Sequence, residues 1–387
     1  MGLILSVNEK RGNNENNSFD ALNKICFFGY YDKKQISYDG RYFLFLMVDF
    51  QDREPEENDR ADIFIGEIET GKYEKLDETY AWNFQQGCML SWLSDEEIIY
   101  NIRIGKEFFS KIYNIRNGKT KIIERPVSCV FPEKKIALSL NFSRLAKWRP
   151  GYGYEGGIDK YEKEKWPEND GIYFVDLKEN KYKLIIPLYR MLEFRKEEEI
   201  KISYGWFNHT LFNRDAKRFC FVNRWKEKLD QPHKTRFITS DIYGNEIYDL
   251  IDSYLISHFD WKDDKEIVVW AEIKGDYGFW IVEDKTKKYK KISDKMQKRD
   301  GHSSFSKDKK FILYDTYPVE NYQYLKIFDI ENDEEITIGK FYSIPEIKGT
   351  PIRCDLHPRW EDKNKITIDS THENYRRSYL IEIGGLI

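Results

Sequence analysis

A short segment built around a histidine recurs four times in the C-terminal half of the chain, and no other feature limits the fold as much. The histidines are 49, 44 and 55 residues apart, and an aspartate follows each of the first three after six residues. In every copy the histidine precedes a polar turn and then a β-branched and aromatic strand pattern. The copies cover residues 208–222, 257–270, 301–314 and 356–368. A period of about 40–50 residues is typical of one four-stranded blade.

Weaker copies of the same hairpin pattern occur upstream, over residues 37–45, 90–100 and 130–138. Together with the four clear copies they make seven repeats. The sequence therefore predicts an all-β fold, a seven-bladed β-propeller of four-stranded antiparallel blades, as a single domain over residues 1–387. The expected blades cover approximately residues 25–78, 79–124, 125–187, 200–252, 253–294, 298–342 and 345–387.

The apolar residues 3–7 have no blade of their own, and the last repeat ends without an outer strand. We therefore expect the N-terminal strand to complete the last blade, because such closure removes free sheet edges. Residues 9–20 are expected to form a flexible surface loop, and residues 144–170 a long aromatic loop between strands. Helical periodicity is weak, and its best candidate, residues 188–194, is interpreted as an insertion.

The composition excludes several classes of partner. A net charge of −4, from 63 basic and 67 acidic side chains, gives no overall attraction to nucleic acid. We find no leader pattern and no run of about 18 apolar residues, so we expect no membrane insertion and a cytoplasmic location. The five cysteines lack C-x-x-C spacing, which favours buried thiols in a reducing compartment.

The recurring histidines are the best candidates for a metal site. The first strand of each propeller blade lines the central channel, so we expect imidazoles at its start to converge. Asp355 lies two residues before His357 and therefore on the same side of its strand. Such a set would supply nitrogen and oxygen ligands to a divalent ion. The predicted ligands are His258, His302, Asp355 and His357. In the alternative, each histidine only stabilises its own blade by bonding a turn aspartate or the backbone.

Arginines and aromatic side chains near the same blade positions suit an acidic sugar, because arginine binds a carboxylate bidentately. The segments 30–32, 85–86 and 315–317 also offer groups that could bond to or stack on sugar rings. The sequence has no G-x-S-x-G, phosphate-binding loop or dinucleotide fingerprint. The predicted catalytic residues are Arg224, His209, Tyr152 and Tyr154. The predicted substrate-binding residues are Arg353, Arg359, Tyr31, Gln86 and Tyr317.

The motifs Gly301-His302-Ser-Ser-Phe-Ser-Lys-Asp308 and Asp355-Leu-His357-Pro resemble those of bacterial oligogalacturonate lyases, seven-bladed propellers with TolB-type repeats. The resemblance is specific from about residue 200 onward. It implies a catalytic manganese, which that family holds with three histidines and a glutamine. His302 and His357 would be ligands, Asp355 stands where the family has another histidine, and the glutamine has no assigned counterpart. The pair His209 and Arg224 is loosely similar to one in the ulvan lyases, also propellers.

These observations support two functional hypotheses. The first is a metal-assisted polysaccharide or oligosaccharide lyase that cleaves a uronate-containing acidic glycan by β-elimination. The ion and arginines would neutralise the carboxylate, and a histidine, tyrosine or arginine would act as base. The second is a non-catalytic propeller that binds a glycan or a protein. The expected cofactor is a divalent metal ion, manganese by the resemblance, with calcium and zinc left open.

Overall fold

The computed structural model describes residues 4–6, 24–194 and 198–384. These residues form seven four-stranded antiparallel sheets, each a meander of sequence neighbours apart from the closing strand of one sheet. The fold is therefore a seven-bladed β-propeller, as the repeats predicted. The chain divides into two compact units. Unit 1 comprises Met1–Ile99, Tyr113–Lys119 and Gly301–Ile387, and unit 2 comprises Tyr100–Ile112 and Thr120–Asp300.

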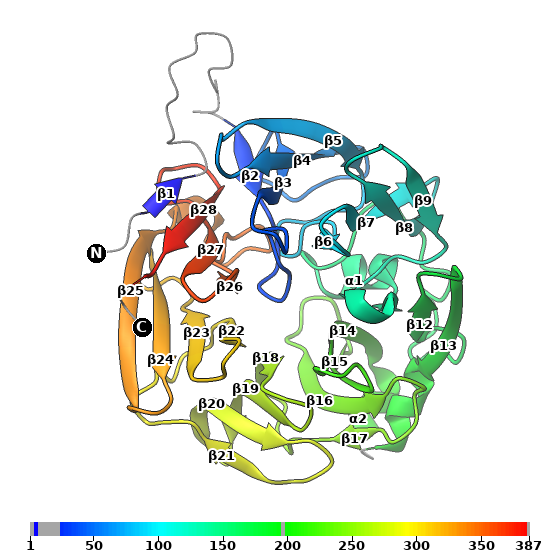
Figure 1. Cartoon of the computed structure of the whole chain (residues 1–387). Coiled ribbons are helices and arrows are strands. Elements are labelled where there is room, and N and C mark those ends of the chain that lie inside the picture. Colours follow the sequence, from blue (N-terminus) through cyan, green and yellow to red (C-terminus); the bar gives the residue numbers. More distant parts are fainter. Residues whose placement is uncertain (1–3, 7–23, 195–197, 385–387) are drawn as a thin grey trace. The chain divides into compact units, whose positions relative to one another are not determined.

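Unit 1 contains three complete sheets (Figure 1). The first consists of β2 (Ile25–Phe27), β3 (Tyr42–Val48), β4 (Ala61–Glu67) and β5 (Tyr73–Thr79). The second consists of β22 (Ser303–Phe305), β23 (Phe311–Asp315), β24 (Tyr322–Asp329) and β25 (Glu334–Tyr342). The third consists of β26 (Arg359–Trp360), β27 (Lys365–Ser370), β28 (Arg377–Glu382) and β1 (Ile4–Ser6).

Unit 2 contains three further complete sheets. The first consists of β10 (Cys129–Phe131), β11 (Ile136–Ser139), β12 (Gly171–Asp176) and β13 (Lys181–Pro187). The second consists of β14 (Tyr204–Phe212), β15 (Arg218–Lys226), β16 (Lys234–Asp241) and β17 (Tyr248–Asp249). The third consists of β18 (Ile256–Trp261), β19 (Glu266–Ile273), β20 (Asp276–Glu283) and β21 (Tyr289–Lys291).

The remaining sheet contributes strands to both units. It consists of β6 (Ser91–Trp92), β7 (Glu97–Ile104), β8 (Glu107–Asn114) and β9 (Thr120–Ile123). No helix in the described part of the chain is long and apolar enough to cross a membrane.

The N-terminal strand β1 closes the last blade, as the sequence predicted. It pairs antiparallel with β28, and Ile4, Leu5 and Ser6 lie opposite Ile381, Leu380 and Tyr379. The outer edge of β28 is thereby paired, which removes an exposed template for aggregation. Leu3, Val7 and the predicted loop over residues 9–20 lie outside the described residues.

The segment after β11 differs from the uninterrupted loop that we expected. Its first part is a helix, α1 (Phe142–Trp148), because the Asn141 side chain accepts a hydrogen bond from the Arg144 backbone and caps the first turn. The segment 188–194 forms a 3₁₀ helix, η3 (Leu188–Glu193), and the short α2 (Glu198–Ile202) follows before β14. Two further 3₁₀ helices are η2 (Pro132–Lys134) and η4 (Pro345–Ile347).

An apolar cluster within unit 1 joins the sheet that contains β22 to the sheet that contains β26. The inner strands alternate apolar and polar residues, so each turns one apolar row toward this cluster. Leu356, which precedes β26, is fully buried in the same cluster. The burial of Leu356 therefore holds its sequence neighbours Asp355 and His357 close to this core. The cluster comprises Leu313, Leu325, Ile327, Phe341, Leu356, Ile366, Ile368, Tyr379, Ile381 and Ile383.

Candidate metal centre

His302 lies just before β22, opposite the end of β23. Because Ser303 pairs with Tyr314, the next residues outward on the two strands, His302 and Asp315, also face each other. The backbone N–H of His302 donates to Asp315 Oδ1 over 2.7 Å, and its Nδ1 lies 3.0 Å from both carboxylate oxygens. Each of the two side chains is only 1% exposed. A neutral ring that donates from Nδ1 keeps a lone pair on Nε2, which is the atom that can bind a metal.

Gly301 allows this close pairing. A Cβ atom at this position would lie 2.1 Å from the backbone oxygen of Asp315, well inside van der Waals contact. Any other residue would push the start of β22 away from β23. The glycine thus brings His302 onto its carboxylate partner.

Asp355 and His357 lie on either side of Leu356, in the segment that leads to β26. The segment is not a strand, since β26 begins only at Arg359. Leu356 is buried in the apolar cluster, and its two neighbours Asp355 and His357 are also buried, at 1% and 2% exposed. His357 has a φ of 42°, in the left-handed region that non-glycine residues rarely adopt. Its backbone N–H donates to Asp315 Oδ2 over 3.2 Å. Asp315 therefore connects the segment of His357 to that of His302.

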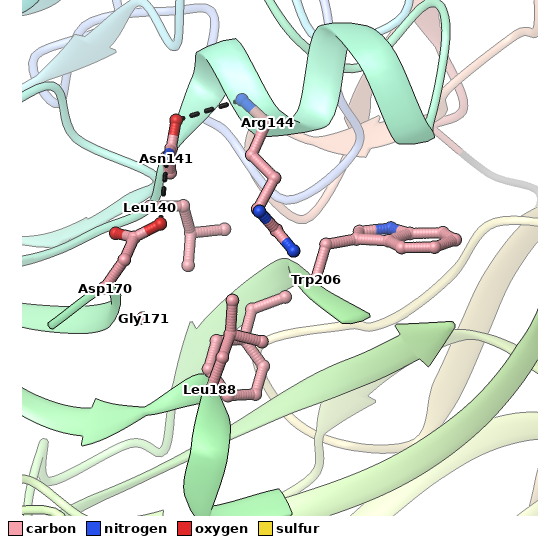
Figure 2. Close-up of a pocket in the computed structure, with 8 residues that line it drawn as sticks. Leu140, Asn141, Arg144, Asp170, Gly171, Leu188 and Trp206 are labelled. Atoms are coloured by element: carbon pink, nitrogen blue, oxygen red, sulfur yellow. Dashed lines mark hydrogen bonds between the residues drawn. The ribbon is translucent and has the colours of Figure 1, made fainter. Parts of the chain in front are cut away.

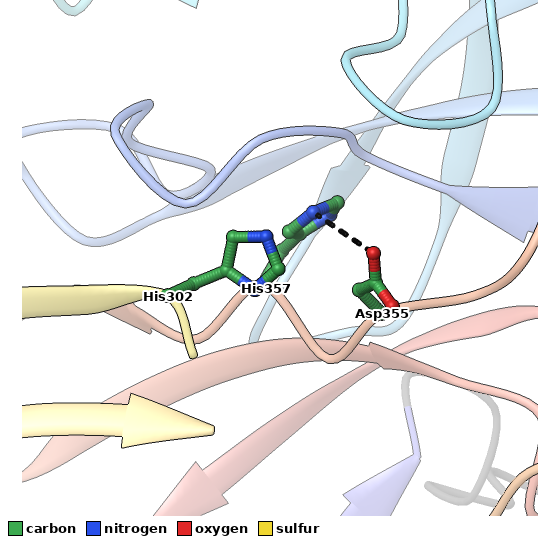
Figure 3. A group of neighbouring side chains, drawn as sticks. All are labelled: His302, Asp355 and His357. Atoms are coloured by element: carbon green, nitrogen blue, oxygen red, sulfur yellow. Dashed lines mark ion pairs between the residues drawn. The ribbon is translucent and has the colours of Figure 1, made fainter. Parts of the chain in front are cut away.

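The structure brings His302, Asp355 and His357 into one buried group (Figure 3). Each residue offers one ligand atom, and these atoms all lie within 4.8 Å of one another. The two imidazole rings are 4.3 Å apart and nearly perpendicular. His357 Nε2 lies 3.9 Å from Asp355 Oδ2.

The ligand types of this group, and the one distance given above between two of its ligand atoms, fit a divalent metal ion. Two ligand atoms that each lie about 2.1 Å from one ion are about 3.0 Å apart at a right angle and about 4.2 Å apart in line. The 3.9 Å between His357 and Asp355 falls within this range. Two imidazoles and one carboxylate are also the ligand types that divalent first-row metals prefer.

Arg353 lies beside the group and pairs with its carboxylate. Its Nε is 2.8 Å from Asp355 Oδ2, and its Nη2 donates to the Tyr317 hydroxyl over 3.5 Å. The Arg353 side chain is 14% exposed, whereas that of Asp355 is 1% exposed. The backbone oxygen of Arg353 accepts a hydrogen bond from Gln85 Nε2 over 2.8 Å.

Three tyrosines surround the two imidazoles with their rings. Tyr30 is 5.0 Å from His357, Tyr31 is 5.3 Å from His302, and Tyr317 is 5.8 Å from His302, between ring centres. Tyr30 and Tyr31 are buried, whereas Tyr317 is partly exposed. Of the predicted substrate-binding residues, Tyr31, Tyr317 and Arg353 thus lie against the candidate metal ligands.

The other predicted substrate-binding residues of unit 1, Gln86 and Arg359, are buried and form hydrogen bonds with other parts of unit 1. Gln86 is buried, and its backbone N–H donates to Asn83 Oδ1 over 2.7 Å. The Arg359 guanidinium is 1% exposed and donates hydrogen bonds to four residues. These partners are Gly29, Gln35, Thr367 and Asp369.

The remaining predicted residues belong to unit 2. His258 lies at a β-bulge of β18, and its Nδ1 is 3.0 Å from Asp300 and 3.1 Å from the Ser257 hydroxyl. His209 has a φ of 46° at a bulge of β14 and stacks on Phe259 with 4.3 Å between ring centres. The role of His258 as a metal ligand and the role of His209 in catalysis remain predictions.

The predicted catalytic residues Arg224, Tyr152 and Tyr154 also lie in unit 2. Arg224 Nε donates to Thr235 Oγ1 over 3.2 Å. The Tyr154 hydroxyl accepts a hydrogen bond from Asn101 over 3.0 Å, and its ring stacks on Phe142 at 4.3 Å. Tyr152 is buried beneath the guanidinium of Arg149, which lies 4.6 Å from its ring centre.

Sequence reasoning missed the part that Asp315 plays. The sequence pattern predicts a sugar contact for its segment, whereas the carboxylate holds His302 and the backbone of His357. The sequence contains the signal in the hairpin register, since the residue that ends β23 must face the one that precedes β22. The aspartates six residues after the histidines do something else. Asp308, for example, accepts from Ser306 and Lys310 in its own turn.

Unit 2 contains a small cavity whose polar lining residues bond to one another. It measures about 10 Å³, room for one water molecule, and lies between α1 and the strands β12 and β14 (Figure 2). Asn141 bonds both Arg144 and Asp170 at its rim. The Arg144 side chain is 1% exposed, pairs with Asp159, and donates to several backbone oxygens. The cavity is too small for an organic ligand.

Comparisons with known proteins define the fold further. No family model and no curated protein matches the sequence. An oligogalacturonate lyase from Vibrio parahaemolyticus is structurally similar, with a TM-score of 0.62 and 12% identity over 94% of this chain and 92% of that chain. An oligogalacturonate lyase in complex with manganese gives a TM-score of 0.64 and 14% identity, with the same two coverages.

The β-propeller domain of the Trilobed protease from Pyrococcus furiosus is also similar, with a TM-score of 0.53 and 11% identity. The match covers 92% of this chain and 96% of that domain. Identities this low show a shared fold and not a shared activity. In its fold, the chain is a β-propeller of the kind found in oligogalacturonate lyases.

Proposed function

We propose that this protein is a metal-dependent lyase that cleaves a uronate-containing oligosaccharide or polysaccharide by β-elimination. The observation that carries the proposal is the buried group of His302, Asp355 and His357, with a carboxylate partner for His302 and an arginine beside it. The similar fold of a manganese-bound oligogalacturonate lyase supports the choice of metal and of substrate class.

In the proposed site, His302, Asp355 and His357 hold a divalent ion, with manganese as the preferred metal. When bound, such an ion supplies Lewis-acid polarisation of a substrate carboxylate. Asp315 holds the His302 ring in place and keeps its proton on Nδ1. The sequence-based prediction that His258 adds a further ligand remains a prediction.

Arg353 has the position and charge to hold the uronate carboxylate. Its side chain is partly exposed, and its Nε lies against the buried carboxylate of Asp355. A guanidinium that pairs with the carboxylate withdraws electron density from it and makes the neighbouring C5 proton more acidic. Tyr317, in contact with Arg353, can orient or stack on the sugar ring.

The elimination also needs a base and a proton for the leaving group. The base takes the C5 proton, a double bond forms between C4 and C5, and the C4–O bond breaks, after which the departing oxygen is protonated. We propose Arg224, His209, Tyr152 and Tyr154 as the catalytic residues of this step.

The proposal is tested by incubating the purified protein with polygalacturonate, glucuronan and alginate, with and without added manganese. We expect ultraviolet absorbance from unsaturated uronate products, abolished by a chelator and restored by manganese. His357→Ala should lower the metal content and abolish turnover while the protein stays folded. Arg224→Lys should retain the metal and lose turnover, because lysine lacks the planar fork.

A metal-loaded wild type that produces no unsaturated uronate from any of these glycans would refute the lyase and favour the binding propeller. Full activity in His357→Ala would show that the chemistry lies elsewhere in the molecule.

A further inference from the structure

The two outer strands of one blade in unit 1, β24 and β25, carry tyrosines and a lysine on one face (Figure 1). Tyr322 of β24 lies opposite Tyr342 of β25, and two residues further along Tyr324 lies opposite Lys340. Alternate residues of a strand share a face, and so do directly opposite residues, so these four side chains lie together as a tyrosine patch. Phe341, between Lys340 and Tyr342, points the other way and is buried in the apolar cluster of unit 1.

The side chains of the tyrosine patch contact one another. Lys340 Nζ lies 3.9 Å from the centre of the Tyr322 ring and 5.8 Å from that of the Tyr324 ring. The Tyr342 ring meets the Tyr322 ring edge-on, with 5.7 Å between ring centres. An ammonium over an aromatic ring contributes about 0.5–1 kcal/mol at an exposed site, so these contacts help to hold the cation on the aromatic surface.

The tyrosine patch is accessible to solvent. Lys340 is exposed, and the three tyrosines are partly exposed. Further along the same face, Tyr314 of β23 and Phe328 of β24 are buried. The face therefore changes from core to surface at the start of β24, which leaves the patch within reach of a ligand.

The charge of Lys340 is not neutralised by an acidic side chain in the part of the chain that the structure describes. Glu335 lies on the same face of the blade, but it bonds Lys326 and the Tyr314 hydroxyl instead. Among the described residues, the hydroxyls of the three tyrosines of the patch also have no side-chain hydrogen bond. Lys340 and these hydroxyls are thus available to an outside ligand.

A second lysine lies at the edge of the tyrosine patch. Lys348 is exposed and donates from Nζ to Asn321 Oδ1 over 3.3 Å, and Asn321 directly precedes Tyr322. The backbone N–H of Ser343, which follows Tyr342, donates to the Asn321 backbone oxygen over 2.7 Å. Lys348 is therefore held beside the Tyr322 end of the patch, and it too lacks an ion pair within the described ranges.

A ligand that matches this surface combines negative charge with an apolar face and hydroxyl groups. The two lysines favour an anionic group such as a carboxylate. The tyrosine rings offer apolar surface, on which the C–H face of a sugar ring packs, and their hydroxyls can donate to and accept from sugar hydroxyls. A simple anion or an acidic peptide would use the lysines alone, whereas an acidic sugar uses all three kinds of group.

We propose that Tyr322, Tyr324, Lys340, Tyr342 and Lys348 form a surface site that binds an acidic sugar, with its carboxylate at the lysines and its ring against the tyrosines. The site lies within unit 1 and shares no residue with the candidate metal centre or with the proposed catalytic and substrate-binding residues. It binds the glycan without acting on it, so it does not rest on the lyase activity.

The experiment is calorimetric titration of full-length Arg353→Gln protein in low-salt buffer that contains a chelator. This background removes the guanidinium proposed to hold a uronate at the metal centre, so the remaining binding reports on the tyrosine patch. We expect tetragalacturonate to bind, and its fully methyl-esterified form, which lacks the negative charges, not to bind. Adding Lys340→Gln or Tyr342→Ala should each weaken the binding of tetragalacturonate about tenfold, which corresponds to about 1.4 kcal/mol.

The matched control is Lys307→Gln in the same background. Lys307 is exposed in the turn between β22 and β23, at the opposite end of the same blade, and its replacement should leave the binding unchanged. Thermal unfolding gives a second readout, because only a ligand of the folded state stabilises it. Tetragalacturonate should raise the Tm of Arg353→Gln and of the control, but raise it less once Lys340→Gln is added.

A hexa-aspartate peptide serves as a probe for charge alone and should bind more weakly than tetragalacturonate. Equal binding of the peptide would overturn the sugar site, since the lysines would then attract any polyanion. The proposal also fails if tetragalacturonate does not bind, if its methyl ester binds equally well, or if Lys340→Gln weakens binding no more than Lys307→Gln does. Since these titrations exclude metal and measure no turnover, a protein without lyase activity can still pass them.

Discussion

Replacing Asp315 with asparagine tests how much the candidate metal centre depends on a carboxylate that is not itself a proposed ligand but holds His302 and the backbone of His357 in place. The wild-type carboxylate accepts from the His302 backbone over 2.7 Å, from His302 Nδ1 over 3.0 Å and from the His357 backbone over 3.2 Å. Asparagine has nearly the same shape but offers one oxygen and one NH₂ group. The NH₂ group must then face at least one of these buried donors.

The magnitude follows from these contacts. Each hydrogen bond to a charged acceptor contributes about 1.5–3 kcal/mol, and a buried donor left without a partner costs about 1–3 kcal/mol. We therefore expect Asp315→Asn to lower the free energy of unfolding by about 2–4 kcal/mol. If the amide donates to His302 Nδ1, the ring proton moves to Nε2, which then cannot bind a metal. Loss of such an orienting carboxylate typically weakens metal affinity about 10–100-fold.

The assay combines denaturant unfolding with calorimetric titration of manganese into the metal-free protein. Asp308→Asn is the matched control, because Asp308 is exposed in the turn of the same hairpin and accepts hydrogen bonds there from Ser306 and Lys310. The control should bind manganese as the wild type does. The reasoning is refuted if Asp315→Asn retains wild-type manganese affinity, or if both variants lose the same amount.

Three further predictions concern other features of the molecule. Arg353→Gln should strengthen manganese binding several-fold, since the guanidinium no longer competes for Asp355, while it weakens uronate binding in the same titration. Gly301→Ala should lower the free energy of unfolding by about 2 kcal/mol or more in denaturant titration, since its Cβ meets the Asp315 backbone. The folded-state pKa of His233, which burial lowers to about 2, lies below the unfolded value of about 6.5, so only the unfolded state takes up this proton as the pH falls. Between about pH 7.5 and 5.5 this should cost the wild type about 1.4 kcal/mol, and His233→Gln should lack that share of the loss in parallel unfolding curves.

The fold was predictable because every blade repeats the same hairpin signal. The alternation of apolar residues and the polar turns repeat seven times, and the unpaired pattern at residues 3–7 indicated the closing strand. The helix α1 was not predicted, because its seven residues are too few for a clear helical period. Its local signal, the capping Asn141, is a single residue that also occurs commonly in turns.

The candidate metal centre was predictable only in part, and the reason is physical. The repeat gives the positions of His302 and His357, and the i, i+2 spacing gives Asp355. The pairing of Arg353 with Asp355 depends on side-chain rotamers, which the sequence pattern does not specify.

The four repeated histidines show why an equivalent position does not imply an equivalent role. His209 stacks on Phe259, His258 bonds Asp300, His302 bonds Asp315, and His357 uses its backbone on that same aspartate. The hairpin places an imidazole at the start of each of these four blades, but the residue that faces it decides which nitrogen keeps a lone pair.

A carboxylate on Nδ1 directs Nε2 toward metal binding, as in the pair of His302 and Asp315, whereas an aromatic ring stacked on the imidazole leaves the tautomer undetermined. His258 has Asp300 at its Nδ1, which favours the tautomer with a lone pair on Nε2. His209 stacks on Phe259, and this contact does not favour either tautomer. Metal titration of His258→Ala and His209→Ala should therefore weaken manganese binding in the first variant and leave it unchanged in the second. The opposite order would show that the carboxylate beside Nδ1 does not make His258 a better ligand than His209.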